Sequence, residues 1–367
     1  MNEIGYEVDF LPVGDGEKSG DAIAIRWGNL FAEKPEQKVV VIDGGFSASG
    51  EALVDHIKKY YKTETVNCLI CTHPDNDHVG GLSVVLEKLK VQNLLMHLPW
   101  KHTNGISEWF KDGRVTDNSV KEKLKESLES AYNLEQLAIK KGINIIEPFT
   151  GLHGFGENLE FRVLGPTKAY YEELLLEFDG TPEVRNFSEA SVFGKLMSFG
   201  ADAITRIRES LDIETLDDSG ETSAENNSSV VLLFNIADEY LLFTGDAGIP
   251  ALGRAVQQLE SEKFDFTKLK FVQVPHHGSR RNIGPSLLNR IIGPKLLVER
   301  KIKTAFVSAA KDGAPKHPAK KVTNAFRRRG APIYGTLGKT LRHSKNAPAR
   351  EGWGNAESLP LYLEVED

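Results

Sequence analysis

The sequence has no long apolar run, almost no cysteine and no excess of basic charge. No run approaches the ~20 apolar residues that cross a bilayer, and the first residues show neither the basic start nor the apolar stretch of a signal peptide. The formal net charge of −7 argues against a general nucleic-acid coat protein. With 40% hydrophobic and 26% charged residues among 367, the chain has a globular composition.

The two cysteines, Cys68 and Cys71, are too few for a disulfide framework, so we expect a cytoplasmic location. Their Cys-x-x-Cys spacing suggests a redox or zinc site, but both lie in VNCLICT, which is typical of a buried strand. Residues three apart on a strand point to opposite faces. We therefore predict two small core side chains.

Charge is distributed unevenly along the chain. Residues 280–350 contain only two acids, Glu299 and Asp312, whereas 172–225 is dominated by acids. The basic stretch includes Arg280, Arg281, Lys316, Lys320, Lys321, Arg327, Arg328 and Arg329. Two interpretations stay open: two solvated faces of opposite sign, or a basic rim that holds a polyanionic substrate.

Strand and helix patterns alternate along most of the chain. Residues 38–45 (KVVVIDGG) and 66–72 (VNCLICT) predict strands, with a helix over 49–61 between them. A long polar helix is expected over 119–142, and 228–248 predicts a hairpin. This order indicates α/β layers. Residues 168–226 interrupt the rhythm, and we interpret them as an inserted, partly helical cap.

Side chains that can bind metals follow several predicted strands. His73, Asp75, Asp77 and His78 lie within six residues after VNCLICT. Asp43, Asp246 and the pair His276–His277 follow three other strands, and sheet ends are where loops gather into a common site. Clustered carboxylates repel one another, and a divalent cation relieves that repulsion. Imidazoles and carboxylates without thiolates suit Zn²⁺ or Mn²⁺.

The THPDNDH loop followed by VGG resembles the His-x-His-x-Asp-His signature of the metallo-β-lactamase superfamily, with Asp75 in place of the second histidine. This variant is similar to the metallo-hydrolase domain of ComEC competence proteins. The segments FLPVGDGEKSGDAIAI, VIDGG, FRVLGPT, NNSSVVLLF, LLFTGDAG, VPHHGS and KHP occur in the order of that family. The resemblance implies an α/β fold, a four-layer αββα sandwich, as one domain over 1–367 with a helical insertion at 168–226.

The resemblance also implies a two-metal site. His73 and Asp75 would hold one ion, with Asp246 bridging to a second ion. The ligands of this second ion would be Asp77, His78 and His277. The superfamily commonly supplies a further histidine where this chain has Asn226 or Asn227, so the first ion would have fewer strong ligands.

Two flanking residues have less defined roles. His276 is expected to support the ligands or, as the less favoured choice, to be a ligand itself. Asp43 would orient an imidazole, although a simple turn aspartate before Gly-Gly explains it equally well.

The expected chemistry is hydrolysis by a water that two cations convert to hydroxide. Asp77 or Asp246 would orient this nucleophile, and His317 would protonate the leaving group. The residues considered for substrate contacts are Ser279, Lys311, Arg327 and Arg328.

The leading functional hypothesis is a phosphodiesterase, specifically a nuclease acting on DNA or RNA, without membrane attachment. A second hypothesis is a small-molecule phosphoesterase whose pocket is covered by the acidic segment 168–226, since an acidic cap should repel long nucleic acids. A third is a non-catalytic binding module, which the retained ligand set opposes. β-Lactamase activity is not expected because the chain shows no export signal.

Overall fold

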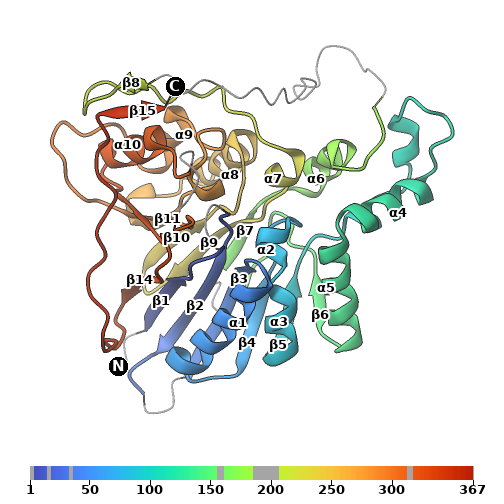
Figure 1. Ribbon diagram of the computed structural model, residues 1–367, viewed down its shortest axis with the longest axis horizontal. Coiled ribbons are helices and arrows are strands. Elements are labelled where there is room, and N and C mark those ends of the chain that lie inside the picture. Colours follow the sequence, from blue (N-terminus) through green and yellow to red (C-terminus); the bar gives the residue numbers. More distant parts are fainter. Residues whose placement is uncertain are drawn as a thin grey trace.

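Two β-sheets form the centre of the protein (Figure 1). The computed structural model describes residues 4–14, 18–32, 36–154, 161–184, 206–311 and 317–366. The first sheet has seven strands: β14 (Leu341–Lys345), β1 (Gly5–Phe10), β2 (Ala22–Asn29), β3 (Glu36–Gly44), β4 (Thr65–Ile70), β5 (Lys90–Leu95) and β6 (Asn144–Ile146), in spatial order. From β3 to β6 all neighbouring pairs are parallel.

The second sheet has six strands in the spatial order β13-β12-β11-β10-β9-β7. They are β13 (Ile333–Gly335), β12 (Thr304–Val307), β11 (Leu269–Gln273), β10 (Glu239–Phe243), β9 (Val231–Ile236) and β7 (Phe161–Gly165). A separate ribbon pairs β8 (Arg206–Arg208) with β15 (Glu364–Glu366). The hairpin predicted over 228–248 is present as β9 and β10, joined by Ala237 and Asp238, whose positive φ values suit a tight two-residue turn.

Helices cover the outer faces of both sheets. The α-helices are α1 (Ser47–His56), α2 (Asn76–Val79), α3 (Leu82–Lys88), α4 (Asp117–Ser127), α5 (Glu129–Lys140), α6 (Lys168–Leu174), α7 (Ala224–Asn227), α8 (Ile249–Ser261), α9 (Pro285–Ile291) and α10 (Lys320–Arg328). In Figure 1, α1, α3 and α5 lie against the first sheet, and α8, α9 and α10 lie with the second. The four-layer αββα architecture is therefore confirmed.

Short helical turns lie between these helices and strands. They are η1 (Ile57–Tyr61), η2 (Pro99–Lys101), η3 (Ile106–Trp109), η4 (Leu175–Glu177), η5 (Phe266–Lys268) and η6 (His276–Gly278). The single helix expected over 119–142 is instead two helices, because the chain leaves helical geometry at Leu128, which has ψ 38°. Among the described residues, no helix combines the length and apolar character that a membrane span requires.

One of the two core clusters lies between the sheets, and a larger one lies under the helices. Phe10 of β1 contacts Phe271 of β11 with ring centroids 5.8 Å apart, which joins one sheet to the other. Cys68 belongs to this inner core, whereas Cys71 packs on the helix-covered side. Both cysteines are buried and free, as their position three apart on a strand predicted.

The segment predicted as a cap, 168–226, is only partly described, since 185–205 lies outside the described residues. Helix α6 buries Tyr170, Tyr171 and Leu174 in the core rather than standing clear of the body. The later part, 206–226, crosses to the C-terminal half, where β8 pairs with β15. A role of this segment in closing over substrate stays a prediction.

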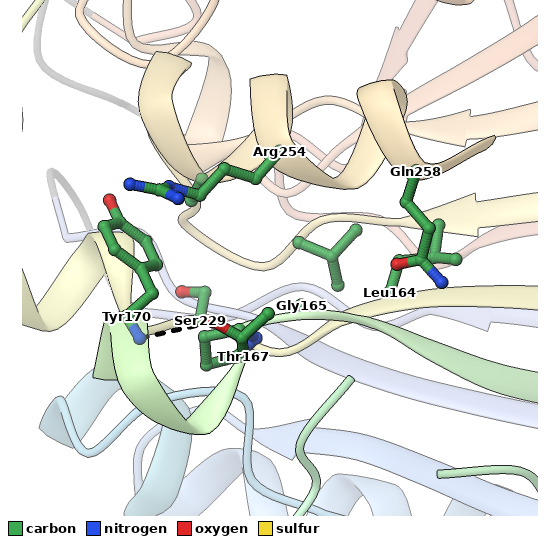
Figure 2. A pocket seen from close by; sticks show the side chains of 10 residues that line it. Leu164, Gly165, Thr167, Tyr170, Ser229, Arg254 and Gln258 are labelled. Atoms are coloured by element: carbon green, nitrogen blue, oxygen red, sulfur yellow. Dashed lines mark hydrogen bonds between the residues drawn. The ribbon is translucent and has the colours of Figure 1, made fainter. Parts of the chain in front are cut away.

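A cavity of about 120 Å³ lies between α8 and the connection from β7 to α6 (Figure 2). Its walls come from β7, β9, α6 and α8, and Ser229, just before β9, forms part of one side.

Candidate metal centre

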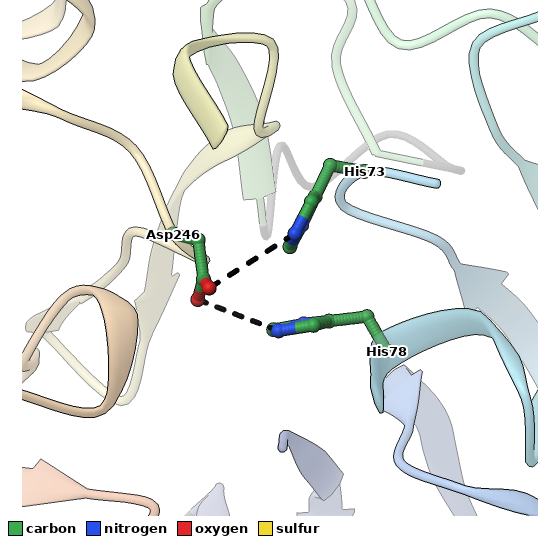
Figure 3. A group of neighbouring side chains, drawn as sticks. All are labelled: His73, His78 and Asp246. Carbon is green, nitrogen blue, oxygen red and sulfur yellow. Dashed lines mark ion pairs between the residues drawn. The ribbon is translucent and has the colours of Figure 1, made fainter. Parts of the chain in front are cut away.

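The predicted ligands lie where strands of both sheets end. His73 follows β4, which runs parallel to β3, and β3 ends with Asp43 and Gly44. Asp246 and His277 follow β10 and β11, which are also parallel neighbours. Parallel strands present their carboxyl ends at the same edge, so the loops of each sheet are brought together there. Figure 3 shows Asp246 approaching from one side and His73 and His78 from the other.

Asp246 lies near the imidazoles of three other predicted ligands. Its Oδ1 is 3.4 Å from Nε2 of His78, and its Oδ2 is 4.0 Å from Nε2 of His73 (Figure 3). Nε2 of His277 is 3.8 Å from the same Oδ2. These separations exceed those of good hydrogen bonds. A carboxylate with imidazoles on several sides, held beyond hydrogen-bonding distance, has the arrangement expected of a shared ligand.

The loop carboxylates complete the cluster. Oδ2 of Asp77 is 3.4 Å from Nε2 of His277 and 3.8 Å from Nε2 of His78. Oδ2 of Asp75 is 3.5 Å from Nε2 of His73. The side chain of Asp75 is 41% exposed, whereas the imidazole of His73 is fully buried. The structure thus brings all six predicted ligands together and leaves one side of the cluster open to solvent.

The buried atoms of this cluster fit a cation. Nε2 of His73, His78 and His277 and Oδ1 of Asp246 are buried and have no hydrogen-bond partner among the described residues. Buried polar atoms in folded proteins are normally paired. Four groups of three side chains lie close enough to hold an ion, and two of these groups consist only of predicted ligands. They are His73–His78–Asp246 and Asp77–His78–His277. Imidazole nitrogens with carboxylate oxygens suit Zn²⁺ or Mn²⁺.

Asp43 holds His78 in orientation. Nδ1 of His78 donates to Oδ2 of Asp43 at 2.8 Å, so Nε2 is turned toward Asp246. The amide and hydroxyl of Thr72 also donate to Asp43, at 2.8 and 2.6 Å. Asp43 is fully buried and accepts three hydrogen bonds. The geometry therefore favours a role in orienting His78 over a simple turn residue.

His276 and His317 lie on the flank of the cluster. Nδ2 of Asn226 donates to Nδ1 of His276 at 3.0 Å, and this nitrogen is 3.5 Å from Oδ2 of Asp246. The rings of His276 and His317 stack with centroids 6.1 Å apart. The amide of Ala319 donates to the carbonyl of Gly278, which anchors the KHP segment beside the HHG loop. The structure therefore brings both histidines to the candidate site.

The cluster has strongly perturbed pKa values. Burial alone would raise the pKa of Asp246, but His78, His276 and His277 lower it well below its usual range. Burial would lower the pKa of His277, yet Asp246, Asp77 and Asp21 raise it to about 9. The pKa values of His73, His78 and His277 are all raised, which favours protonated imidazoles that offset the carboxylates when no cation is bound. Metal binding must displace these protons, because only a deprotonated imidazole nitrogen can be a ligand.

Asp21 is a member of the cluster that the sequence interpretation missed. It is buried directly before β2 and lies within ligand distance of Asp246 and His277. Nε2 of Gln273 donates to its Oδ2 at 2.8 Å. The signal was present in SGDAIAI: β2 is antiparallel to β3, and Ala22 pairs with Gly44, so the residue before β2 lies beside the end of β3.

The basic rim expected from FRRRG is not formed, and this corrects the prediction for Arg327 and Arg328. Arg328 and Arg329 are buried and pair with Glu209 and Glu214 at 2.9 and 2.6 Å. Arg327 pairs with Glu299 at 2.6 Å. Two of these acids, Glu209 and Glu214, belong to the acidic segment, so charges of the two stretches meet at these pairs instead of facing solvent.

Ser279 and Lys311, the other predicted substrate contacts, have clear local surroundings. Ser279 is buried, and its hydroxyl accepts a hydrogen bond from the amide of Arg281 at 3.2 Å. The stem of Lys311 packs over Gly338. Lys316 lies outside the described residues. A substrate role for Ser279 or Lys311 stays a prediction.

Comparison with known families agrees with this geometry. Residues 29–294 match the model of the metallo-beta-lactamase superfamily, which covers more than half of the chain. The chain belongs to the metallo-beta-lactamase superfamily. This confirms the family expectation drawn from the THPDNDH loop, and the hydrolytic, metal-dependent character of the superfamily fits the cluster of histidines and aspartates.

Individual relatives of this superfamily member are distant. The chain is 21% identical over 346 residues to ComE operon protein 3 of Bacillus subtilis (strain 168), which agrees with the ComEC-type pattern. The match covers 90% of this chain but only 32% of that protein.

Two solved structures show similarity at low identity. Unliganded yeast PDE1 is 9% identical, with 90% of this chain and 97% of that chain covered and a TM-score of 0.45. An archaeal superfamily protein from Sulfolobus tokodaii is 18% identical, with 77% and 83% covered and a TM-score of 0.29. Because both TM-scores are below 0.5, the assignment to the superfamily rests on the family match.

Proposed function

We propose that this metallo-beta-lactamase superfamily hydrolase is a phosphodiesterase, specifically a nuclease that cleaves DNA or RNA. The observation that carries the proposal is the carboxylate-rich donor set, in which Asp75, Asp77 and Asp246 accompany the histidines. Oxygen-rich sites with two divalent ions are typical of phosphatases and nucleases, because both the attacking and the leaving oxygen can be stabilised.

The proposal includes two divalent ions, Zn²⁺ or Mn²⁺, held by His73, Asp75, Asp77, His78, Asp246 and His277. Bound at this place, the ions would lower the pKa of a water and offset charge that develops on the phosphoryl oxygens. His73 lies beside Asp75 and His277 lies beside Asp77, and Asp246 is near both histidines, which supports a pair of neighbouring ions with Asp246 between them.

The protein's own side chains have distinct proposed roles. Asp77 and Asp246 orient the attacking water, since their oxygens face the centre of the cluster. His317 protonates the leaving oxygen, and its stacking on His276 keeps it on the flank of the cluster. Asp43 fixes the ring of His78. These assignments explain why the loops after β4, β10 and β11 converge with the KHP segment.

One observation favours the second candidate, a small-molecule phosphoesterase. Arg327, Arg328 and Arg329 all pair with carboxylates, so they offer little charge for a polynucleotide track. The exposed cation that follows the HHGS loop is Arg281, and a nuclease should depend on it. A cytoplasmic location also stays a prediction.

A substrate comparison separates these candidates. Purified protein with Mn²⁺ should cleave plasmid DNA, single-stranded DNA or RNA as well as bis-p-nitrophenyl phosphate. Arg281→Gln should weaken polynucleotide binding and reduce the salt dependence of binding, because one phosphate contact is lost.

Arg114→Gln is the matched control, since Arg114 is 91% exposed on a distant loop and pairs with Asp112. Cleavage of the small ester alone would support the second candidate instead. No cleavage of any phosphodiester by metal-loaded protein would refute the proposal.

A further inference from the structure

The cavity beside α8 combines an apolar interior with polar groups. Leu164, Pro166, Val231 and Ala251 form apolar walls. Its volume is about 120 Å³, and a cavity of ~150 Å³ with aliphatic walls is known to bind benzene. The space therefore suits one six-membered ring.

Three polar side chains give the cavity a preference for a particular ligand. Tyr170 is 3% exposed, and its hydroxyl has no hydrogen-bond partner among the described residues. The exposed guanidinium of Arg254 stacks on the Tyr170 ring at 4.2 Å. No carboxylate in the described part of the chain pairs with Arg254. Figure 2 shows Arg254 and Gln258 descending from α8 toward Tyr170 and Leu164 on the opposite wall.

The side-chain amide of Gln258 can form a hydrogen bond with the polar edge of a bound ring. Its Nε2 donates to Glu262 at 3.1 Å, which leaves the amide oxygen as an acceptor facing the cavity wall. An acceptor at this place suits an N–H donor on a ring, such as the amino group of cytosine. The cation of Arg254 suits a phosphate attached to the same ligand.

The cavity is next to the metal centre. The hydroxyl of Ser229 forms part of its wall and accepts a hydrogen bond from the amide of Asp246 at 3.1 Å. The amide of Ser229 donates to the carbonyl of Asn226, whose side chain contacts His276. One residue therefore separates the cavity from two groups of the candidate active site.

We infer that this cavity binds a pyrimidine nucleotide, with the base between α8 and β7 and a phosphate on Arg254. The choice of ligand rests on the proposed phosphodiesterase function. The nucleotide is either part of a polynucleotide substrate or a free mononucleotide product, since both have the same ring and phosphate.

The test is direct binding, measured by calorimetry on the full chain with metal. CMP and the hexanucleotide (dC)₆ are the probes. Cytidine is the control for the base, and ribose 5-phosphate is the control for the phosphate. We expect CMP or (dC)₆ to bind more tightly than ribose 5-phosphate. Arg254→Gln should weaken this binding by about tenfold, the effect of one charge-assisted hydrogen bond. Ala251→Leu should abolish it by filling the cavity.

Gln258→Leu provides a further variant on an accessible face if Ala251→Leu does not fold, and Arg114→Gln is again the matched control. Binding of CMP alone indicates a product site, and binding of (dC)₆ alone indicates a substrate site. If both probes bind no better than ribose 5-phosphate, or if Arg254→Gln and Gln258→Leu change nothing, the inference is wrong. If CMP binds and the variants weaken its binding, but no phosphodiester is cleaved, the proposed function is wrong and the inference about the cavity stands.

Discussion

The protein buries two clusters of acidic side chains, and they are neutralised in different ways. In the arginine cluster, Glu7 and Asp9 of β1 are fully buried, and Arg350 lies 2.9 and 2.8 Å from them. Among the six predicted ligands of the metal centre, the distances between carboxylates and imidazoles run from 3.4 to 4.0 Å. The first cluster is closed by guanidinium groups in direct contact. The side chains of the metal centre are farther apart, and this spacing leaves room for a cation between them.

This difference separates stability from function. Burying a carboxylate is costly unless a counter-charge is present. Arginine supplies that charge permanently, because its guanidinium stays protonated at any ordinary pH. Imidazoles supply it only until a cation replaces their protons. We therefore expect changes in the arginine cluster to act on folding and changes in the metal centre to act on metal binding and hydrolysis.

The largest expected effect comes from removing two ligands of the metal centre. Asp77→Ala combined with His78→Ala should reduce hydrolysis by at least ~1,000-fold, the scale seen when a central catalytic group is lost. Metal content, measured by mass spectrometry, should fall as well. The control is Asp55→Ala with His153→Ala, which changes exposed residues of the same types. Full activity in the first double variant would reject the site.

Arg350→Ala should break the arginine cluster. It leaves Glu7 and Asp9 without their shared partner, and the free energy of unfolding should fall by about 3–5 kcal/mol. Urea denaturation measures this. Arg290→Ala, which removes a partly exposed pair with Glu260, should cost less than about 1 kcal/mol. Equal losses in the two variants would contradict the contrast between buried and exposed pairs.

Asp43→Asn tests the support of the metal centre. Removing the charge that orients His78 should weaken metal affinity by about 10- to 100-fold. Competition with a metal-binding dye gives the affinity. A circular dichroism spectrum like that of the unmodified protein shows that the fold is retained, and unchanged affinity would mean that Asp43 only shapes the turn.

The smallest effect concerns acid stability. Burial alone would raise the pKa of Asp9, but His56 and Arg350 lower it to about 2. A lowered pKa in the folded state contributes stability above the ordinary value of 3.8, and this contribution is lost as the pH falls from there through about 2. The loss should be about 2 kcal/mol. Urea denaturation at pH 5 and pH 2.5 measures it, and Asp9→Asn should reduce the difference.

The metal centre was largely predictable because its signal is local. His73, Asp75, Asp77 and His78 lie within one loop, and strand ends marked Asp246 and His277. Asp21 escaped because its place depends on the antiparallel pairing of β2 with β3, which a single sequence shows only indirectly.

The prediction from the charge pattern was wrong because it depends on contacts between residues far apart in the sequence. Arg328 and Arg329 form a basic run in the sequence, yet their partners Glu209 and Glu214 lie 119 and 115 positions away. Composition shows the sign of a stretch but not which charges meet on folding. The layers were easier to predict, because apolar periodicity records which side chains face the core.

The pairing of β1 with β14 has a consequence for how the protein is made. Tyr6 and His343, 337 positions apart, are joined by a hydrogen bond of 3.0 Å. While the ribosome is still translating, one edge of the first sheet therefore exposes unpaired backbone groups until β14, more than 330 residues after β1, has also emerged. Completion of that sheet must be a late step of folding, and chaperones that shield open strand edges would have the most time to act there.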